Sequence, residues 1–409
     1  MTSRPSDRSV ASEGTVRDRV RVVVLSDIHA TTEADIQTHV AQATATTPKV
    51  NALTAVRPFL AEQVGSADLL LCPGDLVHRG DPGPMEWVWR ELHTIATDLG
   101  AVVIGSVGNH DLLQKPTGGQ EPQQNLRRLS PPFPYDNKTC VRTYWSDSFG
   151  VVETLDWRVI SLNSCNRHGG FDLEEIDHGR LKPECLPGIS EYLETASAHP
   201  PVNICMCHHH PQEWSHGGTR ITQHLLEGDQ LIALLDSREE RWMLLHGHKH
   251  FPALGYFGHS SHGPVRLSAG SVGINLLWDT GIEVRNQIHV IEFALADSRR
   301  LGVPIAGEVT SYTWEGRGEW AAASPNAGLA SKAGFGYRRD GQELALELAT
   351  KAAHTNRRVY DWDAIVRDLD PRVRYLAPLD REELLRALLR LGGGVAQDVS
   401  ANFLEVTFP

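Results

Sequence analysis

Near its beginning the chain runs Val20-Arg21-Val22-Val23-Val24-Leu25 and then stops at Ser26-Asp27-Ile28-His29. β-branched residues favour a strand, and a nearly continuous apolar run is typical of a strand buried on both faces of a parallel sheet. Ligands bind outside the carboxyl ends of such strands. The polar residues after Leu25 therefore predict a site at this edge of an α/β fold.

Apolar runs of the same kind recur along the chain, and helical patterns lie between several of them. Further strands are expected at residues 68–72, 101–107, 158–162, 202–207 and 242–245. Helices are expected at about residues 50–64, 85–99, 187–198 and 222–235. Strands that alternate with helices indicate α/β layering. The runs at 265–268 and 287–293 lack an intervening helix, and we expect them to add antiparallel strands to a second sheet.

The composition indicates a folded chain with an acidic first part. Hydrophobic residues make up 41% of the 409 residues and charged residues 22%, which excludes a disordered or fibrous chain. The net charge of −12 lies wholly in residues 1–297, which hold 36 acidic and 24 basic residues. This balance argues against a broad nucleic-acid surface. The same part holds 19 of the 20 histidines, and imidazoles with carboxylates are suitable metal ligands.

The division of the chain follows from changes in its character. Residues 1–18 are polar and predict a flexible tail, residues 19–297 a catalytic domain, and residues 298–409 a mixed or helical accessory region. Within the last, a helix is expected from Asp380 as N-cap to Gly392 as C-cap. No apolar stretch reaches the roughly 18 residues of a membrane span. With a polar start and no dense cysteine framework, we expect a cytoplasmic protein without a membrane partner.

Five short polar motifs stand directly after apolar runs, where parallel strands would bring them together. They are Asp27-Ile28-His29, Gly74-Asp75, Gly108-Asn109-His110-Asp111, His208-His209-His210-Pro211 and Gly247-His248-Lys249-His250. Asp, His and an Asn carbonyl suit Fe, Mn or Zn better than Ca or Mg. If extended, each Asp-x-His or His-x-His motif points both side chains the same way. The glycines are expected to allow tight turns, and the ligands suffice for two ions with a bridging carboxylate.

These motifs, in this order, resemble those of the calcineurin-like metallophosphoesterase superfamily over about residues 20–297. The resemblance implies a four-layer α/β/β/α sandwich with two metal ions, which would be Mn, Fe or Zn. It also implies that Asp27, His29 and His250 hold the first ion, that Asp75 bridges, and that Asn109, His208 and His248 hold the second. His209 is the alternative to His208. His110 would lie outside the metal shell and assist the leaving group as a catalytic residue.

The second motif departs from the protein-phosphatase branch of the superfamily. That branch reads G-D-x-x-D-R-G, and here His78 replaces the second Asp. The H-H-H-P and G-H-x-H segments look more like those of the cyclic-nucleotide phosphodiesterase branch. The segment from His78 to Gly80 also resembles that of the DNA-repair nucleases, whose second motif ends in His.

The resemblance therefore implies a binuclear phosphoester hydrolase in which metal-bound hydroxide is the nucleophile. A phosphodiesterase acting on a small molecule or cyclic nucleotide is favoured. The main alternative is a metal-dependent nuclease for DNA or RNA, within a larger complex. A protein phosphatase and a non-catalytic scaffold rank lower. We expect an oligomer or protein partner to bind through residues 298–409.

Overall fold

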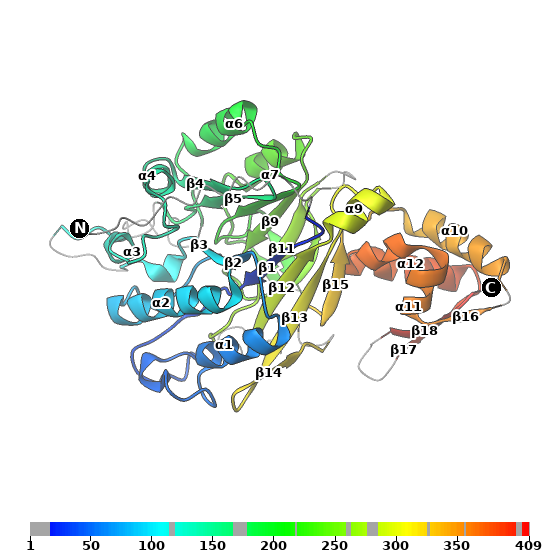
Figure 1. The fold of residues 1–409 in the computed structure, drawn as a ribbon, viewed down its shortest axis with the longest axis horizontal. Helices are drawn as coiled ribbons and strands as arrows, with labels where there is room; N and C mark the ends of the chain where they lie inside the picture. The colour runs from blue at the N-terminus through cyan, green and yellow to red at the C-terminus, as the bar shows by residue number, and fades with distance from the viewer. Residues whose placement is uncertain are drawn as a thin grey trace, which may run out of the picture.

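The computed structural model describes residues 17–113, 119–166, 178–216, 219–258, 263–275, 285–324, 328–355, 357–397 and 403–408. Almost all of the predicted flexible tail, residues 1–18, lies outside these ranges. Two large sheets occupy one end of the molecule, and a smaller helical part occupies the other (Figure 1).

The first sheet has seven strands and carries the first three motifs. Its order is β14 (Glu319–Ala322), β13 (Gly307–Gly316), β12 (Gln287–Phe293), β1 (Val20–Val24), β2 (Leu69–Cys72) and β3 (Val102–Gly105), with β15 (Lys332–Phe335) also paired to β13. β1, β2 and β3 are parallel, so their carboxyl ends meet at one edge. β12 is antiparallel to β1.

The second sheet has six strands and carries the other two motifs. Its order is β10 (Ala253–Tyr256), β11 (Val265–Ser268), β9 (Trp242–His246), β6 (Val202–Met206), β5 (Trp157–Leu162) and β4 (Phe149–Glu153). The four central strands, β11, β9, β6 and β5, are parallel, whereas β10 and β4 are antiparallel edges. A separate hairpin joins β7 (Trp214–His216) to β8 (Thr219–Ile221).

The residues of β1 show why its apolar run is continuous. Val20, Val22 and Val24 pack in a core shared with the second sheet. Val23 and Leu25 point to the opposite face and pack in a core with the helices. Because a strand alternates its side chains, burial of both faces requires apolar residues at nearly every position.

Helices cover the outer faces of both sheets. α1 (Ala52–Gln63) and α2 (Pro82–Leu99) share a core with the first sheet, and α6 (Cys185–Thr195) and α7 (Gly228–Asp236) share one with the second. Asn51 and Asp81 cap α1 and α2 with side-chain acceptors. The short helices α3 (Gln124–Arg127) and α4 (Lys138–Asp147) precede β4. The predicted mixed α/β class is confirmed.

The two strands expected to be antiparallel additions to the second sheet are placed differently. β11 does join that sheet, but it runs parallel to β9. β12 joins the first sheet instead, beside β1. β12 and β13 are antiparallel neighbours, although α9 lies between them in the chain, and seven residues of each are paired, from Gln287 opposite Thr313 to Phe293 opposite Gly307. This pair extends the sheet on the side of β1 that β2 leaves open.

The last part of the chain forms its own apolar core. We call it the C-terminal core; it is built around Val303, Ala306, Tyr337, Leu344, Leu348, Tyr360, Ile365, Val373, Tyr375, Leu384, Leu388, Val406 and Phe408. Its elements are α9 (Leu295–Leu301), α10 (Gly341–Ala353), α11 (Trp362–Ala364), α12 (Pro378–Arg390), and a sheet of β16 (Val359–Tyr360), β18 (Phe403–Thr407) and β17 (Gly394–Gln397). In Figure 1 the helices α10, α11 and α12 of this part lie beyond β15.

The start predicted for the last helix was wrong. α12 begins at Pro378 with Ala377 as N-cap, so Asp380 lies inside its first turn. Proline suits the first helical position because its φ is already helical and its missing N–H is not needed there. Gly392 follows the helix with a left-handed φ of 92°.

The domain boundary proposed between residues 297 and 298 stays a prediction. Strands β13, β14 and β15 lie beyond it and belong to the first sheet, so the chain after residue 297 contributes to both parts of the molecule. Among the described residues, no helix combines the length and the apolar character needed to cross a bilayer.

Candidate metal centre

All five polar motifs lie at the carboxyl ends of parallel strands. β1, β2 and β3 of the first sheet lead to Asp27, Asp75 and Asn109, and β6 and β9 of the second sheet lead to His208 and His248. The seven side chains predicted as metal ligands come together here, from both sheets. None of the predicted ligands lies elsewhere.

The first group consists of Asp27, His29, Asp75 and His250, all buried. The Nε2 atoms of His29 and His250 are 3.1 Å apart. His29 Nε2 lies 3.4 Å from Asp75 Oδ2, and His250 Nε2 lies 3.4 Å from Asp27 Oδ1. Two atoms that each bind one ion at about 2.1 Å stand roughly 3.0 to 3.4 Å apart. These spacings therefore fit a shared ion.

The second group consists of Asp75, Asn109, His208 and His248. His208 Nε2 lies 3.3 Å from Asp75 Oδ2 and 2.9 Å from Asn109 Oδ1. Asn109 Oδ1 also lies 3.1 Å from His248 Nδ1. Asp75 Oδ2 thus stands between the two groups, within 3.4 Å of a histidine nitrogen in each. This is the position that a bridging carboxylate requires.

The hydrogen bonds of His208 indicate that a cation belongs in the second group. Its Nδ1 lies 3.1 Å from the carbonyl oxygen of Pro73, and since a carbonyl only accepts, Nδ1–H donates and Nε2 of the neutral ring carries the lone pair that a metal ion requires. That lone pair meets the Asp75 and Asn109 oxygens, which also carry lone pairs. Asp75 Oδ2 is buried and has no hydrogen-bond partner among the described residues. A metal ion satisfies all three atoms, so the donor set fits.

Burial shapes the protonation of these groups. It lowers the pKa of His29 and of His248 well below the usual value, which keeps both imidazoles neutral and able to bind metal. Burial alone would raise the pKa of Asp75, but His208 and His110 outweigh it and hold that pKa well below its usual range. The bridging position therefore carries a negative charge.

Five of the seven predicted ligands have a left-handed backbone. Their φ values are 51° for Asp27, 49° for His29, 54° for Asp75, 80° for His248 and 60° for His250. This corrects the expectation that the Asp-x-His and His-x-His motifs are extended. Residues other than glycine rarely adopt this backbone region, and residues that do so are concentrated at functional sites. The ligands therefore converge through turns rather than through strand alternation.

The glycines of the motifs are required for two different reasons. Gly74 has a φ of 119°, as the predicted tight turn requires. Gly108 and Gly247 do not have positive φ. Instead, a Cβ at Gly108 would overlap the backbone and carboxylate of Asp75, and one at Gly247 would overlap the carboxylate of Asp27. At these two positions glycine leaves room for the ligands.

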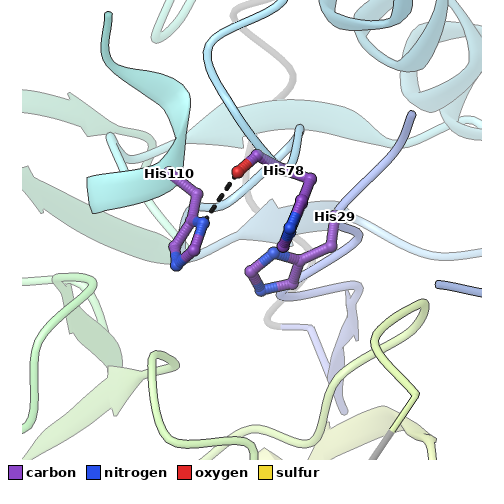
Figure 2. A group of neighbouring side chains, drawn as sticks. All are labelled: His29, His78 and His110. Atoms are coloured by element: carbon purple, nitrogen blue, oxygen red, sulfur yellow. Dashed lines mark hydrogen bonds between the residues drawn. The ribbon is translucent and has the colours of Figure 1, made fainter. Parts of the chain in front are cut away.

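His110 lies beside the first group and outside both (Figure 2). Its ring centroid is 4.8 Å from that of His29, and its backbone N–H donates to Asp75 Oδ1 at 2.9 Å. His110 Nδ1 donates to the carbonyl oxygen of His78 at 2.8 Å, so Nε2 is the atom left to exchange a proton. The ring of His78 stacks on that of His110, with centroids 5.3 Å apart. His78 therefore belongs to the site.

Among the three consecutive histidines, the geometry favours His208 as the ligand. The ring of His209 turns toward Ser164, with Nδ1 2.9 Å from the hydroxyl oxygen. The ring of His210 packs on that of His246 at 4.2 Å. Only His208 reaches Asp75 and Asn109.

Several supporting residues were missed in the sequence. The carboxylate of Asp111 accepts from the backbone N–H groups of Gly108 and Val77, at 2.9 and 3.1 Å, and so ties the second motif to the third. Burial, reinforced by Asp75, raises the pKa of Asp111 to about 8. Ser26 donates to Asp27 Oδ2, and Ser271 donates to the carbonyl oxygen of Asp27 at 2.6 Å. Asp111 is the last residue of the third motif and Ser26 precedes the first, but Ser271 gives no local signal.

Comparison with known proteins agrees with the order of motifs. A family model described as calcineurin-like phosphoesterase matches residues 20–252, which is more than half of the chain. No curated protein sequence matches.

Solved structures that match part of the chain include three from different organisms. A purple acid phosphatase from yellow lupin (Lupinus luteus) seeds is 14% identical, with 74% of this chain and 53% of that chain covered and a TM-score of 0.47. A putative 5'-nucleotidase from Staphylococcus aureus is 16% identical, with 67% of this chain and 51% of that chain covered and a TM-score of 0.38. GAP50, the anchor in the inner membrane complex of Plasmodium, is 12% identical, with 76% of this chain and 91% of that chain covered and a TM-score of 0.43. The chain thus spans about half the length of the first two.

Proposed function

The chain belongs to the calcineurin-like phosphoesterase family and is a phosphoester hydrolase, and from this premise we propose that it is a binuclear-metal phosphodiesterase acting on a small molecule. Cyclic nucleotides are the favoured substrate class. One observation carries the proposal: two groups of buried metal-ligand atoms share Asp75, and His110 stands beside them.

In this proposal each residue of the two groups has one role. Asp27, His29 and His250 would hold the first ion, Asn109, His208 and His248 would hold the second, and Asp75 would be shared by both. The oxygen and nitrogen donors favour Mn, Fe or Zn. When bound, two such ions neutralise charge on the phosphoryl oxygens and lower the pKa of a bound water. The Pro73 carbonyl orients His208, and Ser26 and Ser271 orient Asp27.

His110 is proposed to protonate the leaving oxygen from Nε2. The His78 carbonyl accepts from His110 Nδ1, which fixes the ring and leaves Nε2 for the leaving oxygen. The backbone N–H of His110 donates to Asp75, so the bridging carboxylate and the acid are held together. General acid assistance typically contributes about 10²–10⁴-fold to a rate.

Two features support a small substrate. The His-His-His-Pro and Gly-His-Lys-His segments are of the style found in cyclic-nucleotide phosphodiesterases. The part of the chain that holds the site carries 36 acidic and 24 basic residues, and a negative surface repels the backbone of nucleic acid.

A nuclease is the second candidate, and the position of His78 favours it. The ring of His78 stacks on that of His110, and its centroid lies 5.7 Å from that of His29. In this position His78 can contact a phosphodiester. A partner protein bound through residues 298–409 would supply the missing positive surface. That partner and the cytoplasmic location both stay predictions.

The two candidates differ in their response to salt. We would assay the Mn²⁺-supplemented protein on mononucleotides, cyclic nucleotides, bis-p-nitrophenyl phosphate, and single- and double-stranded DNA and RNA. A small-molecule phosphodiesterase hydrolyses the cyclic nucleotide or the diester with little salt dependence. Degradation of nucleic acid that weakens steeply as salt rises would replace this proposal with the nuclease.

The His110→Ala variant tests the mechanism. It should lose about 10²–10⁴-fold in turnover while binding the same amount of metal, measured by elemental analysis. The exposed His354 provides the matched control, since His354→Ala should leave both quantities unchanged. Full turnover in His110→Ala would remove the role of His110. Absence of Fe, Mn and Zn after reconstitution of the unaltered protein would refute the metalloenzyme altogether.

A further inference from the structure

A cavity of about 300 Å³ lies between the second sheet and the C-terminal core. It is bounded by the beginning of β9, by β10 and β11, by residues 301–305 after α9, and by residues 336–339 after β15. Since the ligands His248 and His250 follow the other end of β9, this cavity is separate from the metal centre. Its volume is at the lower end of the roughly 300–1,000 Å³ of small-molecule sites.

Four arginines line this cavity, and none of the acidic residues that the structure describes does. They are Arg241, Arg338, Arg339 and Arg372. Two of them are held against aromatic rings of the wall: Arg338 lies 4.2 Å from the ring centroid of Tyr256, and Arg372 lies 5.0 Å from that of Tyr337. Arg372 also pairs with Asp370 at 2.7 Å, outside the wall. Each guanidinium has five N–H donors, so such pairing leaves donors for a ligand.

Two buried donors in the same wall have no hydrogen-bond partner. They are the indole Nε1–H of Trp242 and the hydroxyl of Tyr337, and their residues are only 2% and 7% exposed. No described residue accepts from either. Unpartnered buried donors are uncommon because burial removes their water. Both atoms lie just beneath the surface of the wall, so an acceptor in the cavity would complete them once their side chains shift.

The rest of the wall is apolar. Leu301, Val303, Pro304 and Ile305 form one side, and Val265 belongs to the other. A ligand that fits must therefore present negative acceptor groups to the arginines and an apolar body to these side chains. We propose that this cavity binds a small organic anion, with a carboxylate, phosphate or sulfonate group attached to an apolar body. Such a ligand would connect the second sheet to the C-terminal core.

The direct test is calorimetric titration of the metal-loaded protein with 1-naphthalenesulfonate, which has both properties. We expect one binding site, with an affinity at least about tenfold higher than that for the neutral 1-naphthalenemethanol. The affinity should be unchanged after removal of metal by a chelator, since the cavity is separate from the ligands. Loss of binding on chelation would assign the anion to the metal centre, and equal binding of the neutral compound would overturn the anion site.

Two variants locate the binding within the cavity. Arg338→Gln should weaken binding about tenfold or more, and Tyr337→Phe about fivefold. The matched controls are Arg386→Gln, on the exposed face of α12, and Tyr360→Phe, whose hydroxyl bonds to Thr355. Both controls should bind as the unaltered protein does.

Thermal unfolding without the anion separates ligand binding from structure. Tyr337→Phe should be as stable as the unaltered protein, because it removes a donor that has no partner. If Arg338→Gln fails to fold, Tyr337→Phe decides alone. Unchanged affinity in Tyr337→Phe would then overturn the proposal.

Discussion

The loops at the metal centre and the C-terminal core are built in opposite ways. In the loops, five buried ligands have a left-handed backbone, and the side chains that meet are carboxylates, an amide and imidazoles. In the C-terminal core, apolar side chains of α10, α12 and β18 pack together. After Arg317, no described residue other than glycine has a positive φ.

The difference separates stability from chemistry. Burial of apolar surface stabilises the C-terminal core, whereas buried charge and strained backbone in the loops cost free energy that metal binding repays. We therefore expect substitutions in the loops to change activity more than stability, and substitutions in the C-terminal core to do the reverse.

The largest effect is expected from Asp75→Asn. This change keeps the shape of the bridging side chain and removes its charge, so kcat/KM should fall at least about 10³-fold, since the ions contribute several kcal/mol to the transition state. Metal content should fall as well. The melting temperature of the metal-free protein should stay the same or rise, because a buried charge is lost. Asp98→Asn, on the surface of α2, is the control. Retained metal and turnover in Asp75→Asn would show that the loops do not carry the chemistry.

Leu388→Ala tests the other side of the comparison. Leu388 is fully buried in the C-terminal core, and its truncation should lower the free energy of unfolding of this part by about 2–5 kcal/mol. Denaturant unfolding followed by hydrogen exchange measures the loss. The folded variant should keep its kcat and its metal. A parallel fall in kcat would show that the two regions are coupled.

Acid should destabilise the sheets more than the C-terminal core. Burial lowers the pKa of His289 in β12 to about 3, against about 6.5 in an unfolded chain. Below pH 6.5 the unfolded chain binds a proton that the folded chain does not, so this contribution is complete above pH 6.5 and falls as the pH drops toward 3. Between pH 7 and pH 5 the loss is about 2 kcal/mol.

The variant His289→Gln isolates that contribution. Denaturant unfolding of the metal-free protein at both pH values should show an acid loss about 2 kcal/mol smaller than that of the unaltered protein. The only histidine of the last 112 residues, His354, is exposed, and His354→Gln should leave the acid loss unchanged. Equal losses in the unaltered protein and in His289→Gln would contradict the pKa assigned to His289.

The smallest effect is expected at the start of α10. The Asp340 carboxylate accepts from the backbone N–H groups of Gln342 and Glu343, at 2.9 and 3.0 Å. Asp340→Ala should therefore lower stability by about 1 kcal/mol, and Asp340→Asn, which keeps the acceptor, by much less. Neither should alter activity. Equal losses in both variants would point to the charge of Asp340 rather than to its hydrogen bonds.

The sequence was informative where the signal is local. Each ligand motif follows its own apolar run, so the edge at which Asp27, Asp75 and Asn109 meet could be predicted from parallel strands alone. The left-handed backbone of the ligands could not, because it depends on contacts such as that of Gly247 with Asp27, 220 positions apart. The start of α12 was missed because Asp380 is a plausible N-cap by residue type. The helix instead begins two residues earlier, at Pro378.

Long-range pairing was harder to predict. Nothing within the apolar run of β12 indicates which of the two sheets it joins. The cavity brings together Arg241, Val303, Tyr337 and Arg372, which belong to four separate segments. No spacing in the sequence marks them as neighbours.

The two sheets share the metal centre, and this has a mechanical consequence. Asp27, Asp75 and Asn109 are carried by one sheet, and His208, His248 and His250 by the other. A slip of one sheet along the other by a single residue, about 3.3 Å, would carry every histidine of the second sheet out of bonding range. The bound ions would therefore hold the two sheets in register. Metal occupancy would then report how well the two sheets are aligned.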